Sequence, residues 1–428
     1  MMRGLLFSLL ALASATVAAQ EVSLRHALDG KALDALATLV VRFNDEQQRL
    51  KDKFKAKVVL EDQRSVEDKR QLPHMAFLDE EDGMAFFGTR PRFRPLHLVM
   101  KDAREKFDAG RFYPQVAEAV DDLTGKVQAL PMGLALPALY INRDAFRKSG
   151  LDPDKPPRTW WEVQKAAGEL FDHGYKCPLT SSRFAWVHIE NVSSQHGESI
   201  VSKSGKSERL TVNAMVNVKH IALLASWHKS FYFHYFGPGH EGDQKFSSGT
   251  CAMLTGESPV AAQLVRDAKF EVGVAELPHY DDVYGFKPAD VLPDGAALWI
   301  LADKKKEDYK AVARFMSFLL RPEVQNEWIK ATAFLPMTPQ AMDGLRASGV
   351  APAILAQAEK RLSMAKVGHR AKNGFGRGRI REILAEEIAF VWQNTKPAKE
   401  ALDTAVLRAN SVLSSLNEPP VRTAAAKK

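Results

Sequence analysis

The sequence contains little cysteine and few long hydrophobic runs. Only 2 of its 428 residues are cysteines, which excludes a small scaffold held together by many disulfides. After the apolar run Leu5–Ala13, no stretch reaches the ~18 apolar residues of a membrane-spanning helix, so a multi-span membrane protein is excluded. A hydrophobic content of 45% and a charged content of 26% are those of a globular protein, and they exclude a disordered or collagen-like chain.

The common signatures of catalysis are missing as well. The sequence has neither a Gly-x-Ser-x-Gly nucleophile elbow nor a His-Glu-x-x-His zinc motif. Gly374–Arg379 resembles a phosphate loop but lacks its Gly-Lys-Ser/Thr ending, which favours a flexible basic turn, with contact to an anion as the alternative. The run Asp79–Asp82 offers the paired carboxylates of a hydrolase, but a solvated acidic turn is the commoner origin of such a run. The sequence therefore predicts a protein that is not an enzyme and uses no cofactor.

Histidine and cysteine give no clear metal site. His228, His234 and His240 do not share one face of a helix, so surface or packed histidines are expected rather than a metal cluster. Cys177 and Cys251 leave two alternatives, one disulfide in an oxidising compartment or two separate buried thiols. A zinc site is not supported, because no histidine or second cysteine lies near either of them at the spacing of a zinc finger.

The first twenty residues have the plan of a secretory signal. A short positive start with Arg3 precedes the apolar run, and the small residues Val17 and Ala19 predict cleavage after Ala19. A buried N-terminal helix is the alternative. Cleavage lowers the formal net charge from +7 to +6. Export removes nucleic acid as the reason for this basic charge and for a pI near 9.1.

The mature chain is long enough for two or three domains. Strands alternate with helices throughout, which predicts an α/β protein. Thr159 and Glu162 form a capping box that begins a helix. The tail from Pro419 is expected to be disordered. Seven tryptophans exceed the needs of the helical faces and suggest surfaces that stack on sugars, although any single tryptophan is more commonly part of a core. Helices are expected around 27–44, 144–148, 309–320, from 322 onward, and around 383–392 and 398–413, and strands at 57–60, 139–142, 270–274 and 296–301.

Several motifs occur in a characteristic order along the chain. They are Leu139–Pro153, Pro157–Trp160, Phe246–Met253, Gly295–Trp299, Phe315–Trp328 and Phe334–Pro336. Together they strongly resemble the extracellular solute-binding proteins of carbohydrate-type ABC importers. Within that family, Phe184–Asn191, Val218–Ala222, Ala401–Val406 and the positions of both cysteines are similar to the glycerol-3-phosphate-binding subgroup.

The resemblance implies a fold and a function. The fold is the two-lobe periplasmic-binding-protein (Venus-flytrap) fold, with hinge crossings near Gly133–Leu136, Leu292–Pro293 and Phe334–Met337. The function is the substrate-binding component of an ABC importer, which captures glycerol-3-phosphate or a glycerophosphodiester by lobe closure. The alternatives are an uncharged sugar or polyol or a zwitterion as the solute, and then a secreted non-transport module or a hydrolase. The implied partners are a small polar solute and inner-membrane ABC permease subunits, and the protein is expected to be a monomer. The implied division of the chain is a signal peptide at 1–19, an N-terminal lobe at 20–132 and 293–334, a C-terminal lobe at 136–291 and 338–415, and a disordered tail at 416–428.

The resemblance also implies which residues bind the ligand. Four positions match the subgroup: Glu81 would accept hydrogen bonds from hydroxyl groups, Trp186 would stack on the ligand, Gly295 would line it, and Arg381 would pair with an anionic group. Four other positions depart from it. Serine is expected at Ala135 and at Glu257, tyrosine at Phe334 and tryptophan at Arg183, and a tyrosine is missing around Arg64–Val66. Glu257 argues against a bare phosphate unless Arg183 or Arg381 neutralises it. The alternative is that Glu257 and Arg183 form a structural salt bridge.

Overall fold

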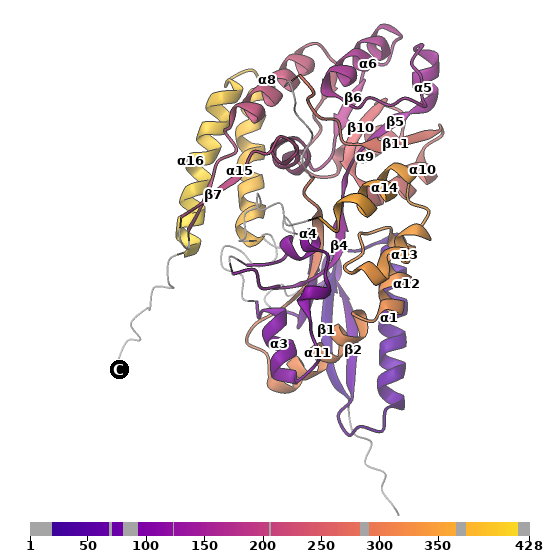
Figure 1. Ribbon diagram of the computed structural model, residues 1–428, viewed down its shortest axis with the longest axis vertical. Helices are drawn as coiled ribbons and strands as arrows, with labels where there is room; N and C mark the ends of the chain where they lie inside the picture. The colour runs from indigo at the N-terminus through magenta and orange to yellow at the C-terminus, as the bar shows by residue number, and fades with distance from the viewer. Residues whose placement is uncertain are drawn as a thin grey trace, which may run out of the picture.

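The computed structural model describes residues 19–67, 71–79, 93–122, 124–204, 207–282, 291–364 and 374–417. Two five-stranded sheets lie one above the other along the long axis of the molecule, with helices around both (Figure 1). This arrangement confirms the predicted α/β fold with two lobes.

The first sheet occupies the lower half of Figure 1 and has the strand order β2-β1-β3-β12-β4. Strand β1 pairs in parallel with β2 and β3, and β12 pairs antiparallel with β3 and β4. Its strands are β1 (Gln20–His26), β2 (Ala56–Asp62), β3 (Met75–Leu78), β4 (Leu130–Ala135) and β12 (Asp294–Ile300). The helices around it are α1 (Gly30–Arg49), α3 (Leu96–Ala103), α4 (Pro114–Glu118), α11 (Lys306–Leu319) and α12 (Pro322–Thr332).

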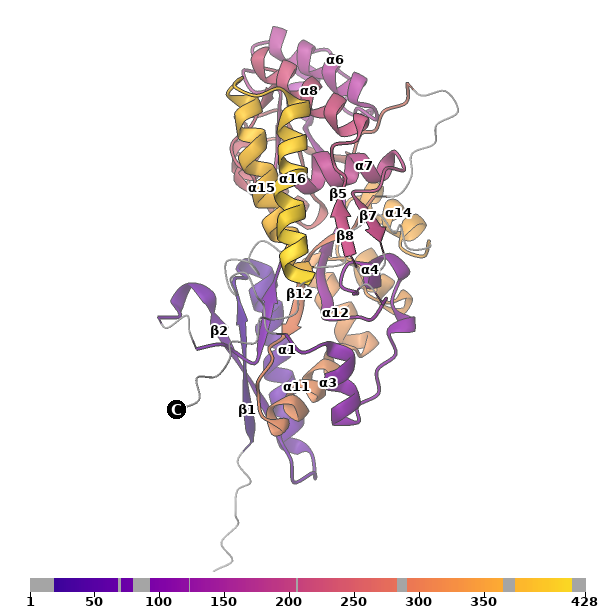
Figure 2. The same cartoon turned by 90° about the vertical axis from the view of Figure 1, so that its left-hand side faces the viewer.

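The second sheet has the order β11-β5-β10-β6-β9. The last two helices of the chain, α15 and α16, lie side by side on the outer flank of this half of the molecule in both views (Figure 2). The strands are β5 (Pro137–Asn142), β6 (Leu179–Ser181), β9 (Phe233–His234), β10 (Met253–Glu257) and β11 (Val272–Glu276). The longer helices are α6 (Trp160–Asp172), α8 (Met215–Lys229), α14 (Pro352–Arg361), α15 (Gly374–Trp392) and α16 (Ala398–Asn417), and shorter ones are α5 (Arg143–Lys148), α9 (Glu241–Ser247) and α10 (Ala261–Asp267). A small hairpin, β7 (Val201–Ser204) with β8 (Ser207–Leu210), completes this half.

The chain passes between the two sheets three times. Leu136 alone separates β4 of the first sheet from β5 of the second. The chain returns in the segment between β11 and β12, and it crosses again after α12, where the backbone N–H of Leu335 donates to the carbonyl of Leu134 at 2.8 Å. After this last crossing, α14 packs on β11 of the second sheet.

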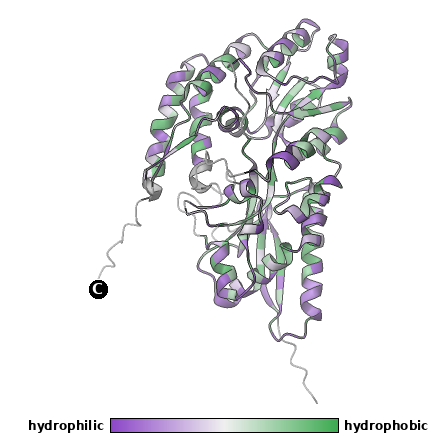
Figure 3. Ribbon diagram, in the orientation of Figure 1, coloured by the Kyte–Doolittle hydropathy of each residue, from purple (hydrophilic) through white to green (hydrophobic). Residues whose placement is uncertain are grey.

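Two apolar cores hold the sheets in place. One joins the first sheet to α1, α11, α12 and one face of the second sheet, and the other joins the opposite face of the second sheet to α6, α8, α15 and α16. All six residues of β4 and all six of β5 are buried, as expected for strands covered on both faces. Hydrophobic and hydrophilic residues alternate along the helices, as expected for helices with one buried and one exposed face (Figure 3).

Most of the expected elements are present, with some shifts. The Thr159 capping box begins α6, with Thr159 Oγ1 accepting from the N–H of Glu162 at 3.2 Å. The strand expected at 270–274 lies at Val272–Glu276. Strand β1 was not anticipated, because its apolar alternation is short and includes the buried polar residues Arg25 and His26.

Two expectations about local features were wrong. Gly374–Arg379 is not a turn but the beginning of α15, because the helical pattern that follows it extends back to Gly374. The surplus of tryptophan is mostly packed inside: Trp160, Trp186, Trp227, Trp299 and Trp328 are each at most 7% exposed. These five tryptophans therefore belong to the cores, as expected for any single tryptophan.

Some predicted features lie outside the described residues. They are most of the signal segment (1–18), most of the acidic run around Glu81 (80–92) and the end of the tail (418–428). Helix α16 extends to Asn417, two residues into the expected tail. Within the described part of the chain, no helix has the length and apolar character needed to cross a membrane.

Candidate binding site at the crossing between the sheets

Strand ends from both sheets meet around Leu136. Ala135, the last residue of β4, pairs with Asp294, the first residue of β12. On the other side, Pro137 of β5 pairs with Glu257, the last residue of β10. Leu136 itself joins the two sheets through Ser258, whose N–H donates to the Leu136 carbonyl at 2.8 Å and whose Oγ accepts from the Leu136 N–H at 3.1 Å. Two carboxylates, Asp294 and Glu257, are thereby placed on opposite sides of one crossing point.

Arg183 connects these two carboxylates. Its guanidinium donates through Nη1 to Glu257 at 3.0 Å and through Nη2 to Asp294 at 2.6 Å, and it lies 4.7 Å from the ring centroid of Trp186. The backbone of Arg183 has a φ of 49°, a left-handed conformation that is uncommon for a residue other than glycine. A hydrogen bond from its N–H to the Gly239 carbonyl at 2.6 Å helps to hold it there. Such strained residues gather at functional sites, where the surrounding structure fixes them.

Arg381, on α15, reaches the same point from the other flank. Its Nε and Nη2 donate to the two carboxylate oxygens of Glu190 at 2.6 and 2.9 Å, which is a bidentate pair. Its Nη1 donates to Asp294 at 2.7 Å. The side chains of Arg381, Glu190 and Asp294 are at most 6% exposed. The sequence prediction assigned an anionic ligand to Arg381, and the structure fills that place with two carboxylates of the chain itself.

These side chains form one network, which we call the crossing cluster. Its members are Arg183, Glu190, Glu257, Asp294 and Arg381. Two guanidinium groups and three carboxylates give it a formal charge of −1. Glu257, with its side chain 19% exposed, is the most accessible member. Burial of charges is costly unless each is paired and hydrogen-bonded, and the shared use of Asp294 by both arginines meets that requirement.

A histidine lies within electrostatic reach of the crossing cluster. His240 is half exposed, and its Nδ1 lies 3.1 Å from Asp243 Oδ2. The hydrogen bond with Asp243 raises the pKa of His240 to about 9, with the charge of Glu257 adding to the rise and burial and Arg183 opposing it. His240 therefore carries a positive charge at neutral pH, and Asp243 balances that charge.

Trp186 fixes the return crossing. Its Nε1 donates to the carbonyl of Leu292 at 2.9 Å, and the N–H of Leu292 donates to Asn191 Oδ1 at 2.8 Å. Both residues belong to the π-helical segment Trp186–Asn191, a form of helix that is rare and frequent at functional sites. Trp186 is only 1% exposed and Arg183 covers its ring, so its direct role here is to support Arg183 and the crossing.

Gly295 and Phe334 belong to the same crossing. Gly295 has a φ of 140°, and a Cβ on it would lie 2.1 Å from the carbonyl oxygen of Gly133, so only glycine fits the pairing of β12 with β4. Phe334 is half-buried, and its ring stacks on Trp328 with centroids 5.9 Å apart. It immediately precedes Leu335, whose hydrogen bond to β4 places Phe334 next to the crossing.

The structure thus brings together most of the residues that the sequence predicted for the ligand. They are Ala135, Arg183, Trp186, Glu257, Gly295 and Arg381, with Phe334 adjacent; Glu81 lies outside the described residues. The sequence reasoning missed Asp294 and Glu190. Asp294 directly precedes the predicted Gly295, and Glu190 follows Trp186 by four residues inside a quoted motif, so their positions carried a signal. Whether their charges face the arginines depends on long-range packing.

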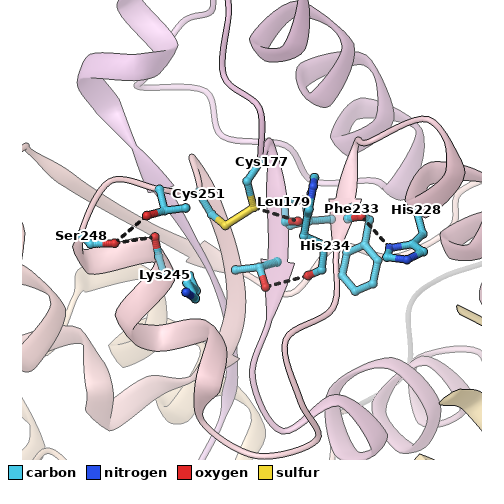
Figure 4. Close-up of a disulfide and its surroundings, with 10 residues drawn as sticks. Cys177, Leu179, His228, Phe233, His234, Lys245, Ser248 and Cys251 are labelled. Carbon is cyan, nitrogen blue, oxygen red and sulfur yellow. Dashed lines mark hydrogen bonds between the residues drawn. A yellow bond between two sulfur atoms is a disulfide. The ribbon is translucent and has the colours of Figure 1, made fainter.

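The structure answers two questions that the sequence left open, one about Arg183 and Glu257 and one about the two cysteines. Arg183 and Glu257 contact each other. Cys177 and Cys251 form a disulfide that joins the segments leading into β6 and β10 (Figure 4). In the same view His228 Nδ1 faces the carbonyl of Phe233 at 3.1 Å. Among the described residues, no group of three or more histidine, cysteine, aspartate or glutamate side chains is arranged to hold a metal ion.

Comparison with known proteins shows which family the chain belongs to. Residues 68–353 match the family model of bacterial extracellular solute-binding proteins. The chain is 37% identical over 344 residues to the sn-glycerol-3-phosphate-binding periplasmic protein UgpB of Salmonella paratyphi A, with 78% of each chain covered. It is 36% identical over 344 residues to the protein of the same name from Escherichia coli K12, again with 78% of each chain covered.

The fold is shared with solved structures as well. UgpB from Mycobacterium tuberculosis in complex with glycerophosphocholine has a TM-score of 0.72 at 18% identity, covering 92% of this chain and 98% of that one. The curated relatives are periplasmic, which implies the same location for this chain. Proteins of this kind bind a small solute and work with inner-membrane permease and ATPase components. The chain therefore belongs to the bacterial extracellular solute-binding protein family and is the solute-binding component of an ABC importer.

Proposed function

We propose that this protein captures a small polar solute at the crossing between its two sheets, and that the lobes close around it. The solute belongs to the class named for its relatives, glycerol-3-phosphate or a glycerophosphodiester. The lobes are residues 20–132 with 293–334 and residues 136–291 with 338–415, and the crossings near Leu136, Leu292 and Phe334 act as hinges. Contacts from both lobes to one solute stabilise the closed state over the open one.

The observation that carries this proposal is the convergence at the crossing. Side chains that are distant in the sequence, from Ala135 to Arg381, meet at the ends of strands from both sheets. Charged side chains are buried there to an extent that a core alone does not require, and one of them, Arg183, has a strained backbone. A site at this place changes shape when the sheets move relative to each other. A receptor needs this property, because the closed shape tells the permease that a solute is bound.

The residues of the crossing take different roles. Glu257 and Phe334 contact the solute, since their side chains are partly exposed. Arg183, Trp186 and Arg381 hold the shape and charge of the site. Ala135 and Gly295 keep the paired backbones of β4 and β12 close together at the site. Glu81 contributes hydrogen bonds to hydroxyl groups of the solute.

The protein does not turn its solute over. A general acid has to release a proton, whereas the carboxylates of Glu190, Glu257 and Asp294 all accept hydrogen bonds from arginines. The mature chain begins at Gln20 after cleavage of the signal, and it acts as a monomer that meets the inner-membrane permease in the periplasm.

Ligand-dependent closure tests the proposal. The mature protein, purified gently, is examined by native mass spectrometry for a co-purified solute and by small-angle X-ray scattering before and after removal of that solute. We expect a bound small molecule and a smaller radius of gyration in its presence. Glu257→Gln weakens binding, whereas Glu271→Gln, which removes a surface partner of Arg143 and Arg147, leaves it unchanged. A chain that carries no solute, and whose radius does not change with any glycerol phosphate derivative, contradicts the proposed function.

A further inference from the structure

The two arginines of the crossing cluster are already engaged by carboxylates of the chain. Arg381 donates through Nε and Nη2 to Glu190 and through Nη1 to Asp294. Arg183 donates through Nη1 to Glu257 and through Nη2 to Asp294. An acidic group is held best by a guanidinium fork that is open to it. A phosphate ester at the crossing would have to displace a carboxylate from either arginine, so a different cation is better placed to receive it.

His240 is a cation beside the crossing cluster. The carbonyl of the residue before it, Gly239, accepts the 2.6 Å hydrogen bond from the N–H of Arg183. The charges of Glu257 and Arg183 both act on its imidazole. The side chain of His240 is half exposed, and burial nevertheless acts to lower its pKa, so protein surrounds the ring without covering it. A solute at the crossing can therefore reach this side chain.

Asp243 fixes the orientation and the charge of the imidazole. Its Oδ2 lies 3.1 Å from His240 Nδ1, and its Oδ1 accepts from Ser182 Oγ at 2.6 Å. The hydrogen bond with Asp243 is the main cause that raises the pKa of His240 to about 9, so both ring nitrogens carry a proton at neutral pH. Because Nδ1 is directed at Asp243, Nε2 is the second donor. No residue in the ranges that the structure describes accepts a hydrogen bond from it.

The segment that carries His240 is packed closely against its surroundings. Gly242 approaches the end of β6 so closely that a Cβ on it would lie 2.5 Å from the carbonyl oxygen of Ser181. The carboxylate of Glu241 lies against Gly237, where a Cβ would be only 2.3 Å from its carboxyl carbon. A donor that is already held in place loses less conformational entropy when a ligand binds to it.

We infer that His240 is a solute-binding residue of the site: its Nε2–H donates to the phosphate ester of the solute, and Asp243 and Ser182 position it. The sequence resemblance assigns the anionic group to Arg381, whereas this inference gives it to His240 and leaves Arg381 with its carboxylates. A phosphate monoester and a phosphodiester share the oxygens that the imidazolium binds, so the experiment includes both. The inference rests on the proposed function, since it concerns the same site.

Isothermal titration calorimetry with charge variants tests the inference. The probes are glycerol-3-phosphate, a monoester, and glycerophosphocholine, a diester. His240→Gln removes the positive charge, and we expect it to weaken each probe that the wild-type protein binds by about tenfold or more, because a charge-assisted hydrogen bond is lost. His240→Lys restores a positive charge and should recover part of the affinity. His173→Gln, which changes an exposed histidine at the end of α6, is the control and leaves binding unchanged.

The pH dependence of binding separates a direct contact from a structural role. Glycerophosphocholine serves here, because a phosphodiester lacks the second ionisation near pH 6 of a phosphate monoester. For the wild-type protein the affinity should stay within about twofold between pH 5.5 and pH 8, since His240 is charged throughout. Asp243→Asn removes the hydrogen bond that raises the pKa of His240, so the affinity should fall several-fold as the pH rises. Glu257, Arg183 and Glu241 are present in both proteins, so the difference between the two profiles reports Asp243.

The outcomes separate the inference from the proposed function. Each variant is checked by circular dichroism. Where Asp243→Asn does not fold, or the wild-type protein does not bind glycerophosphocholine, the two His240 variants carry the test alone. Binding by His240→Gln as tight as by the wild type, a loss that His240→Lys does not recover at all, or an Asp243→Asn profile that matches the wild type overturns the inference while the proposed function stands. Failure of both probes, with no co-purified solute, contradicts the proposed function and the inference with it.

Discussion

The carboxylate of Asp294 lies 2.7 Å from the guanidinium of Arg381, although 87 residues separate the two in the sequence. Asp294 begins β12 in the first sheet, and Arg381 belongs to α15, which packs on the second sheet. The contact therefore ties a strand of one half of the molecule to a helix of the other. Arg183 binds the same carboxylate oxygen at 2.6 Å, so a single side chain anchors both arginines.

Loss of that anchor is expected to destabilise the protein strongly. Asp294→Ala leaves two buried arginines with too few carboxylates, and breaking a buried ion pair from one side costs about 3–5 kcal/mol of unfolding free energy. Urea denaturation followed by circular dichroism measures the loss. The matched control is Asp154→Ala, which removes an exposed partner of Arg143 and costs less than about 1 kcal/mol. Equal losses in the two variants would show that the crossing cluster does not stabilise the fold.

The disulfide is expected to stabilise the second half of the molecule. Cys177 and Cys251 lie 74 residues apart, and in the loop-closure model a cross-link of that span contributes about 4 kcal/mol. Cys177→Ala combined with Cys251→Ala should lower the urea midpoint accordingly, while the preference among solutes stays the same, because neither cysteine belongs to the crossing cluster. A double variant as stable as the wild type would disprove this contribution.

Gly295 is expected to tolerate no side chain. In Gly295→Ala the new Cβ meets the backbone carbonyl of Gly133 at 2.1 Å, and the residue must also keep a positive φ. Gly197→Ala provides the matched control, because Gly197 has a φ of +71° with open space around it, so that its cost is only the ~1–2 kcal/mol of the backbone conformation. Thermal unfolding compares the two variants. A Gly295→Ala protein no less stable than Gly197→Ala contradicts the predicted clash.

Acid is expected to destabilise the second half through two buried histidines. His188 and His220 lie 2.9 Å apart, and their outer nitrogens face Thr255 and Tyr280. Burial lowers the pKa of His188 to about 3 and the pKa of His220 well below its ordinary value. Below pH 6.5 the unfolded chain binds more protons than the folded one, so stability falls as the pH decreases from 6.5 toward about 3.

A histidine that stays neutral in the folded protein contributes at most about 1.4 kcal/mol per pH unit below pH 6.5. Unfolding free energies measured by urea denaturation between pH 7 and pH 4 give the slope, and His220→Gln should reduce it by the share of one histidine. His173→Gln, which changes an exposed histidine, is the control and keeps the slope of the wild type. An unchanged slope in His220→Gln would show that these histidines do not govern the acid response.

The sequence by itself determined the class of fold, the family and most of the secondary structure. Apolar periodicity located α11, α12 and α16, and the Thr159–Glu162 pair located the start of α6, since these patterns depend on residues within one or two turns. Family motifs then pointed to Ala135, Gly295 and Arg381 as ligand-binding residues. The structure places all three at the crossing between the sheets, and their binding to a ligand stays a prediction.

Only the tertiary structure decided what these residues do to one another. The sequence left open whether Arg183 faces a ligand or Glu257 and whether Cys177 and Cys251 are bonded, and the resemblance assigned an anionic group of the ligand to Arg381. The structure joins Arg183 to Glu257, bonds the two cysteines, and fills the fork of Arg381 with Glu190 and Asp294. The physical reason is that a charge acquires its partner only when strands and helices distant in the sequence pack together, whereas a helix or a cap is specified by its nearest neighbours.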